Sequence, residues 1–192
     1  MSIERWEIDS SHSGIHFGVR HLLISRVRGR FGRWSGTLHV RDGDWSLAKV
    51  EVVIDASSIE TGIADRDTHL RAADYLDVKR YPDITFRARY VTSAVDGRRT
   101  VRGMLAIKGR SREVTLEVED AGVRQDAWGN ERAGFSAKVS FDRRHFGVTG
   151  NLALKSGVVI GERIDVEIQV EAVRQPAPTM DAATEQSMAG TR

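Results

Sequence analysis

Hydrophobic and polar residues alternate with a period of two along most of this chain. Such alternation predicts strands with one buried face, because successive side chains of a strand point to opposite sides. The sequence contains eight of these runs, at 15–19, 26–40, 50–54, 84–90, 101–107, 114–118, 135–141 and 164–170. In the second run the apolar parity shifts between Phe31 and Trp34, which predicts a bulge near Gly32 and Arg33.

Eight strands with one apolar face each predict an all-β fold, an eight-stranded antiparallel β-barrel. An open sheet would leave unpaired edges, whereas closure removes them. A barrel of this size is either filled by side chains or able to hold one small ligand. The predicted inward faces combine small residues such as Ala88 and Gly103 with phenylalanines. This combination fits both a packed barrel and a hollow one.

One segment, DRDTHLRAADYLDVKRY, interrupts the alternation and predicts a short helical insert. Its Leu70, Ala73 and Leu76 are spaced like one side of a helix. Asp65 fits the N-cap position, and Pro82 would end the helix. The insert is long enough to lie across one mouth of the barrel.

Composition and chain ends indicate one domain of a soluble protein. The chain of 192 residues is 40% hydrophobic and 29% charged, and it contains no apolar run long enough for a signal peptide or a membrane span. We therefore expect a cytoplasmic protein. From 175 onward the sequence is small and polar, so we predict a barrel domain at 1–174 and a disordered tail at 175–192.

The charge pattern disfavours a nucleic-acid partner. The net charge of +2 is small, and acidic residues interleave with basic ones on several predicted strands. Arg26, Arg28 and Arg30 alternate along one strand, with Arg20 near them on the next. We interpret this row as a solvated face. The alternative is transient contact with anionic lipid head groups at a membrane surface.

Motifs for catalysis and metal binding are missing from the sequence. There is no cysteine, no G-x-S-x-G motif and no P-loop, so we predict no catalytic residues and no cofactor. His12 and His16 are four residues apart, but they fall at a loop-to-strand junction without an H-E-x-x-H motif. We therefore predict no metal site and interpret His12 with Ser13 as a turn.

Polar residues gather at the start of the predicted helix. Arg66 and His69 suit an anionic head group, since arginine and helix N-termini both favour anions. Alternatively, Arg66 and Asp67 brace the insert against the barrel. The RRH sequence at 143–145 fits either a barrel end or a solvated turn.

Five stretches of the chain follow one another in a distinctive order: WEIDSSHSGIHFGVRHL, SSIETG, DRDTHLRAADYLDVKRYPDITF, VRGMLAIKGRSREVTLEV and FSAKVSFDRRHFGV. Together they resemble the YceI-like family of polyisoprenoid-binding proteins over roughly residues 6–173. The resemblance implies an extended, lipocalin-like barrel whose apolar interior holds a long isoprenoid or other lipid tail. It favours the hollow barrel. Many family members are exported, but this sequence shows no signal-like run, so we do not expect a periplasmic role.

The resemblance turns the predicted inward residues into candidate ligand contacts. The candidates for the lipid tail are Phe17, Val19, Phe31, Leu38, Val52, Phe86, Ala88, Gly103, Leu105, Phe135, Ala137, Phe141 and Ile168. The candidates for the head group are His12, Arg66 and His69.

These expectations combine into a non-catalytic carrier for a long-chain amphiphile, such as a polyisoprenoid, an isoprenoid quinone or a fatty-acid-like lipid. Two alternatives stay open. One is a lipid-modifying or metal-dependent enzyme, which would need polar residues converging inside the barrel. The other is an interaction domain with a filled barrel and no ligand. The sequence also leaves a homodimer open.

Overall fold

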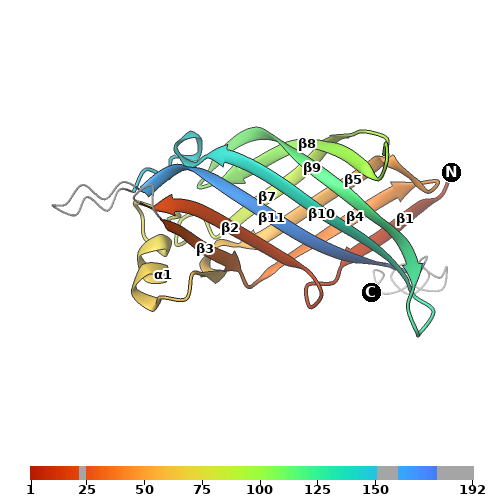
Figure 1. The fold of residues 1–192 in the computed structure, drawn as a ribbon, viewed down its shortest axis with the longest axis horizontal. Helices are drawn as coiled ribbons and strands as arrows, with labels where there is room; N and C mark the ends of the chain where they lie inside the picture. Colours follow the sequence, from red (N-terminus) through yellow and green to blue (C-terminus); the bar gives the residue numbers. More distant parts are fainter. Residues whose placement is uncertain (22–24, 151–159, 177–192) are drawn as a thin grey trace, which may run out of the picture.

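In the computed structural model, long strands pair into a barrel with a helical insert at one end (Figure 1). The structure describes residues 1–21, 25–150 and 160–176. The strands are β1 (Ile3–Ile8), β2 (Gly14–His21), β3 (Ser25–Phe31), β4 (Trp34–Arg41), β5 (Asp44–Asp55), β6 (Ile59–Glu60), β7 (Asp83–Val91), β8 (Arg98–Ile107), β9 (Arg110–Gln125), β10 (Glu131–Asp142) and β11 (Ile160–Arg174). The helices are α1 (Ala64–Arg71) and the short 3₁₀ turns η1 (Ala56–Ser58) and η2 (Arg143–Phe146).

The strands pair antiparallel and form a closed ring. The order β1-β4-β5-β7-β8-β9-β10-β11 returns to β1, whose Trp6 and Ile8 pair with Arg174 and Ala172 of β11. This confirms the predicted eight-stranded antiparallel barrel.

Three barrel strands each consist of two shorter ones. β2 continues the ladder on β11 where β1 ends, from Gly14 opposite Gln169 to His21 opposite Ile160. β3 pairs with β2, and β6 pairs with β3. Three barrel strands therefore bend once, and each is made of two consecutive elements: β1 with β2, β3 with β4, and β5 with β6. Alternation alone does not predict β1, because its apolar residues are not evenly spaced.

The parity shift after Phe31 is confirmed, but it takes the form of an interruption rather than a bulge. Gly32 and Arg33 separate β3 from β4, and η1 covers the gap. The Gly32 N–H donates to the Ser58 carbonyl at 3.0 Å, and the Asp55 N–H donates to the Arg33 carbonyl at 3.0 Å. The bend is therefore held by backbone hydrogen bonds to η1 and to the last residue of β5.

The helical insert is shorter than predicted. Helix α1 begins after Ile63 rather than at Asp65, and the predicted cap at Asp65 is wrong. The helix ends at Arg71, because Ala72 has extended backbone angles (φ −72°, ψ 170°) and its N–H bonds to the His69 carbonyl. The remaining residues up to 81 are mainly turns, so the helical spacing reaches beyond the real helix.

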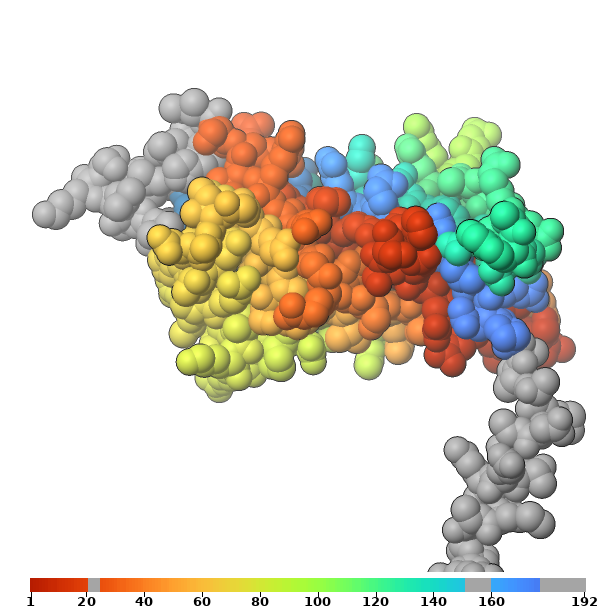
Figure 2. Space-filling view, turned by 90° about the horizontal axis from the view of Figure 1, so that it is seen from below, coloured from red at the N-terminus to blue at the C-terminus, as the bar shows by residue number. Residues whose placement is uncertain are grey.

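The insert and the N-terminus lie at opposite ends of the barrel (Figure 1). Figure 2 shows the insert, in yellow, covering one end of the molecule. No helix in the described ranges combines the length and the apolarity that a membrane crossing needs. β11 ends at Arg174, and the Gln175 N–H still bonds to the Arg5 carbonyl at 2.8 Å. The rest of the predicted tail, from 177 onward, lies outside the described residues.

Candidate functional site

The barrel encloses a cavity of about 530 Å³. Inward side chains of the barrel strands form its wall, and residues of the insert contribute at one end. This volume lies within the range of roughly 300–1,000 Å³ that is usual for small-ligand pockets. The barrel is therefore hollow rather than filled.

Most of the predicted inward residues line this cavity. They are Phe17, Val19, Phe31, Leu38, Val52, Phe86, Leu105, Phe135, Ala137, Phe141 and Ile168. Their position follows from strand alternation, which the closed barrel converts into an inside and an outside. Their contact with a lipid stays a prediction.

Ala88 and Gly103 do not belong to the lining among the described residues. The two residues pair across β7 and β8, beside the large side chain of Phe86. A Cβ on Gly103 would lie 2.6 Å from the Phe86 ring and 2.5 Å from the Arg87 carbonyl oxygen. The ring therefore covers the inner side of the glycine, and this small residue makes room for an aromatic side chain rather than for a ligand.

Tryptophans add lining that alternation predicts incompletely. Trp34 and Trp45 both line the cavity, and the ring centroids of Trp45 and Phe135 are 5.1 Å apart. Trp6 is buried behind Trp45, with centroids 5.3 Å apart. Period-two alternation counted back from Val50 does not assign Trp45 to the inner face, because the two residues are an odd number of positions apart.

Arg66 and His69 line the insert end of the cavity, as the sequence suggested. Arg66 donates from Nε to the Thr61 hydroxyl at 2.7 Å and from Nη2 to the Thr61 carbonyl at 2.8 Å. His69 Nε2 lies 2.9 Å from an Asp74 carboxylate oxygen, and its ring meets Tyr75 edge-on at 5.1 Å. Both side chains are thus positioned by partners within the insert.

The predicted braces Arg66 and Asp67 both bond to Thr61, whereas Arg71 bonds the insert to the neighbouring turn and strand. Buried Asp67 accepts hydrogen bonds from the Thr61 N–H at 2.9 Å and from the Thr61 hydroxyl. Burial alone would raise the pKa of Asp67, but the Thr61 bonds and the nearby guanidinium groups lower it overall. Arg71 donates to the carbonyls of Ser57 and Ile59, both at 2.7 Å, and so fastens α1 to the strand edge.

Arg143 is a buried barrel-end residue rather than part of a solvated turn. Its guanidinium donates to the backbone carbonyls of Val148 at 2.7 Å, Gly150 at 3.0 Å and Gly161 at 3.0 Å. It lines the cavity, but these bonds engage its donors in holding the loop after η2. Arg144 beside it is exposed and lowers the pKa of Asp142 to about 2.

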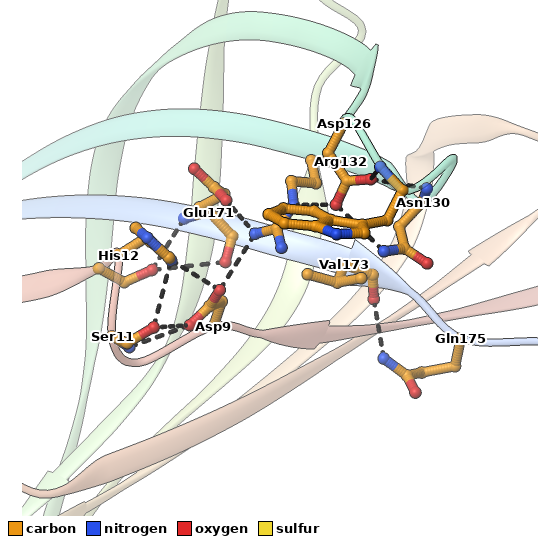
Figure 3. Close-up of polar contacts among 11 residues, drawn as sticks. Asp9, Ser11, His12, Asp126, Asn130, Arg132, Glu171, Val173 and Gln175 are labelled. Atoms are coloured by element: carbon orange, nitrogen blue, oxygen red, sulfur yellow. Dashed lines mark hydrogen bonds and ion pairs between the residues drawn. The ribbon is translucent and has the colours of Figure 1, made fainter.

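His12 lies outside the cavity, on the turn between β1 and β2 (Figure 3). Its Nδ1 is 2.8 Å from an Asp9 carboxylate oxygen, and Arg132 bonds to Asp9 and Glu171. The structure thus separates His12 from Arg66 and His69, and nothing in its position supports a head-group role.

Asp9, His12 and Glu171 bring three ligand atoms within 4.8 Å of one another. In the sequence Asp9 is only three residues before His12, but Glu171 comes from β11 and no local spacing shows it as a neighbour. However, Arg132 Nη1 lies 3.0 Å from Asp9 and also pairs with Glu171. The guanidinium therefore already supplies the positive charge that a metal would bring.

A family model for the YceI-like domain matches residues 6–172. The chain belongs to the YceI-like family.

Its relatives match over almost the whole domain. A UPF0312 protein of Vibrio parahaemolyticus is 32% identical over 167 residues, which cover 86% of this chain and 84% of the relative. The protein YceI of Salmonella newport is 33% identical over 167 residues, with 87% and 84% covered.

Solved structures of the family share the fold. BcnA of Burkholderia cenocepacia has a TM-score of 0.73 at 20% identity, covering 85% of this chain and 98% of that one. The YCEI protein of Campylobacter jejuni has a TM-score of 0.70 at 28% identity, covering 82% and 90%. A polyisoprenoid-binding domain of Saccharophagus degradans has a TM-score of 0.66 at 20% identity, covering 88% and 98%.

Proposed function

We propose that this YceI-like protein binds a long-chain amphiphile inside its barrel and carries it without chemical change. The observation that carries the proposal is the cavity of about 530 Å³ with a mainly apolar lining. Burial of a hydrocarbon tail there contributes roughly 25 cal/mol for each Å² of apolar surface removed from water. Association costs offset part of this gain.

The comparison with the Saccharophagus degradans domain supports a lipid of the polyisoprenoid class, since that protein is described as polyisoprenoid-binding. The lining of the cavity fits the same class. Aromatic and branched side chains line it from the insert end to Trp45, so an extended apolar chain can follow the barrel axis. Isoprenoid quinones and fatty-acid-like lipids share this property and are included in the proposal.

The two alternatives fit the structure less well. An enzyme needs polar groups that converge on one point, whereas Thr61, Arg66 and His69 in the lining are bonded to other residues of the insert. An interaction domain without a ligand would have a filled barrel, and this barrel is hollow. A cytoplasmic location remains part of the proposal, to be tested by cell fractionation.

Native mass spectrometry of the purified protein before and after organic extraction tests the proposal. We expect a co-purifying lipid mass that extraction removes and that returns when the extracted lipid is added back. A protein that carries no lipid after purification and takes up none of a panel of polyprenols, quinones and fatty acids would contradict it. Conversion of the returned lipid to a different mass would support the enzyme instead.

A matched pair of variants locates the lipid. Ala137 of β10 lines the cavity, so Ala137→Leu narrows it and should lower lipid occupancy at least several-fold. Ala106 of β8 has the parity opposite to that of Leu105 and does not line the cavity among the described residues. Ala106→Leu adds the same volume and should leave occupancy unchanged. Equal occupancy in both variants would place the lipid elsewhere.

A further inference from the structure

Arg99 is a cation on the inward face of β8. It has the same strand parity as Val101 and Leu105, and all three line the cavity. Its side chain is only 8% exposed. A buried, inward arginine in an apolar wall needs an explanation, because charged groups are rarely fully buried without a complete set of partners.

Arg99 has an ion-pair partner, and its buried Nε donor is without one among the described residues. Nη2 bonds to the carboxylate of Asp120 on β9, which is itself 19% exposed. Nε of Arg99 is buried and has no hydrogen-bond partner in the part of the chain that the structure describes. Leaving a buried donor unsatisfied costs as much as losing a hydrogen bond. Within the described ranges, Arg99 Nε is therefore a buried donor that still lacks an acceptor.

Arg99 lies at the end of the barrel away from α1. It follows the β7–β8 hairpin, where the Asp120 N–H donates to the Gly97 carbonyl at 2.7 Å. Asp44, at the start of β5, is close enough for Arg99 to affect its pKa, which is lowered mainly by hydrogen bonds from Ser46. Figure 1 shows the β7–β8 hairpin and the β4–β5 turn, which leads into Asp44, at the end opposite the helical insert.

The cationic residues at the insert end differ from Arg99. Arg66 uses Nε and Nη2 on Thr61, and Arg143 uses its donors on backbone carbonyls. Among the described cavity-lining cations, the unsatisfied buried donor thus belongs to Arg99. The polar contact that a bound ligand can satisfy at least cost is at this end.

We propose that Arg99 Nε donates a hydrogen bond to an uncharged oxygen of the bound amphiphile, a carbonyl or a hydroxyl. The polar end of the ligand then lies beside Arg99, and its tail runs toward the helical insert. This inference rests on the proposed lipid-binding function and adds the orientation and the chemical class of the polar end.

The charge balance is the reason for an uncharged oxygen. Asp120 already neutralises Arg99, and Asp44 adds a further negative charge nearby. An anionic head group would bring a negative charge into this apolar cavity without its own counter-ion, and such burial is costly. A neutral acceptor satisfies Nε without that cost.

Displacement of a bound uncharged fluorophore, N-phenyl-naphthylamine, tests this with ligands of equal chain length. The probes are dodecane, methyl decyl ketone, dodecanol and dodecanoate. We expect the parent protein to prefer the ketone and the alcohol to dodecane by about tenfold, the effect of one buried hydrogen bond. Dodecanoate should not bind more tightly than the ketone. Tighter binding of dodecanoate would overturn the uncharged acceptor.

The variants remove the ion pair as a unit, because Arg99→Met alone would leave the half-buried Asp120 carboxylate without its partner. In the double variant Arg99→Met with Asp120→Asn, we expect dodecane to bind as in the parent and the ketone preference to disappear. The control Arg98→Met removes the neighbouring arginine of β8, whose side chain is 77% exposed and lies outside the cavity lining, and it should keep that preference. A preference that survives in the double variant, or that is lost in the control, overturns the proposal.

Failure of the proposed function has a different signature from failure of this inference. If none of the probes, dodecane included, displaces the fluorophore from the parent protein, the cavity does not bind apolar chains, and both proposals fall. If dodecane binds and the ketone gains nothing, only the Arg99 contact is refuted.

Heteronuclear NMR of the arginine Nε–H groups in the parent needs no variant: the Arg99 signal should shift with the ketone and not with dodecane. An unshifted signal overturns the contact.

Discussion

Gly103 lies against the Phe86 ring, and this contact shapes the cavity wall. A methyl group at this position would approach the ring to 2.6 Å and the Arg87 carbonyl to 2.5 Å. The backbone cannot yield easily, because the carbonyl belongs to the paired strand β7. The glycine is therefore required by packing on the wall, and the size of the cavity depends on where the Phe86 ring lies.

Gly103→Ala should lower the free energy of unfolding by about 1–3 kcal/mol, as is usual when a packed interior receives extra atoms. Chemical denaturation of the purified variant measures this. Gly32→Ala is the control, since its Cβ would meet the flexible end of Glu60 at 3.3 Å and the Ser58 carbonyl oxygen at an ordinary contact distance of 3.8 Å. It should change stability by no more than about 0.5 kcal/mol. Equal effects of the two substitutions would contradict the packing role of Gly103.

At the scale of elements, Arg132 on β10 joins three separate parts of the barrel. It pairs with Asp9 in the β1–β2 turn, with Asp126 in the β9–β10 hairpin at 2.8 Å, and with Glu171 on β11 (Figure 3). Hydrogen bonds from Ser11, His12 and Arg132 lower the pKa of Asp9, and Arg132 is the main cause of the lowered pKa of Asp126. The network stabilises the bend that turns β1 and β2 into one barrel strand.

The direction of these two pKa shifts predicts how the stability of the folded protein depends on pH. Both carboxylates have a lower pKa in the folded than in the unfolded protein, where it is about 3.9. Their stabilising contribution is thus complete above that value and is lost as the pH falls below it toward the folded pKa. The melting temperature of the parent should therefore decrease as the pH is lowered below about 4.

Arg132→Gln should lower the melting temperature by a few degrees at neutral pH and make its decrease in acid shallower. Thermal unfolding followed by circular dichroism over this pH range measures both effects. Arg5→Gln is the control, because the exposed Arg5 side chain pairs with nearby Glu7 at the surface, and such surface pairs contribute little. An Arg132 variant with the acid response of the parent would contradict the role of the network.

At the scale of the whole molecule, the row of arginines on β3 faces solvent as predicted, but it is partly neutralised. Arg26 pairs with Asp165 at 2.6 Å, and Arg30 pairs with Glu60 at 2.9 Å. These partners come from β11 and β6, the strands on either side of the β2–β3 pair. The net positive field of this face is therefore weaker than the sequence of β3 suggests.

We expect the parent and a variant with Arg26→Gln, Arg28→Gln and Arg30→Gln to co-sediment equally with acidic lipid vesicles. A membrane-binding face would contribute about 1 kcal/mol for each free basic residue near the surface. Salt would then weaken the binding, since screening acts within about 8 Å at physiological ionic strength. Salt-sensitive sedimentation of the parent alone would show that the row contacts membranes.

Strand alternation by itself determined the barrel and most of its inner surface. Period-two spacing depends only on local backbone geometry, so it assigned Phe17, Phe135 and Ile168 to the inside correctly. The family motifs in the sequence added the expectation of a hollow interior. Local signals were weaker in the insert, where hydrogen bonds from Thr61 to Asp67 and the turn at Ala72 decide the limits of α1.

Only the tertiary structure decided which residues meet across the barrel. Arg99 and Asp120 lie on different strands, and Arg132 gathers carboxylates from positions as distant in the chain as Asp9 and Glu171. Such pairs depend on strand register and on closure of the sheet, which no local spacing encodes. Strand register and sheet closure also decide whether a small inward residue leaves empty space in the cavity or is covered by a neighbouring side chain. Gly103 shows this, because the ring that covers it belongs to the adjacent strand.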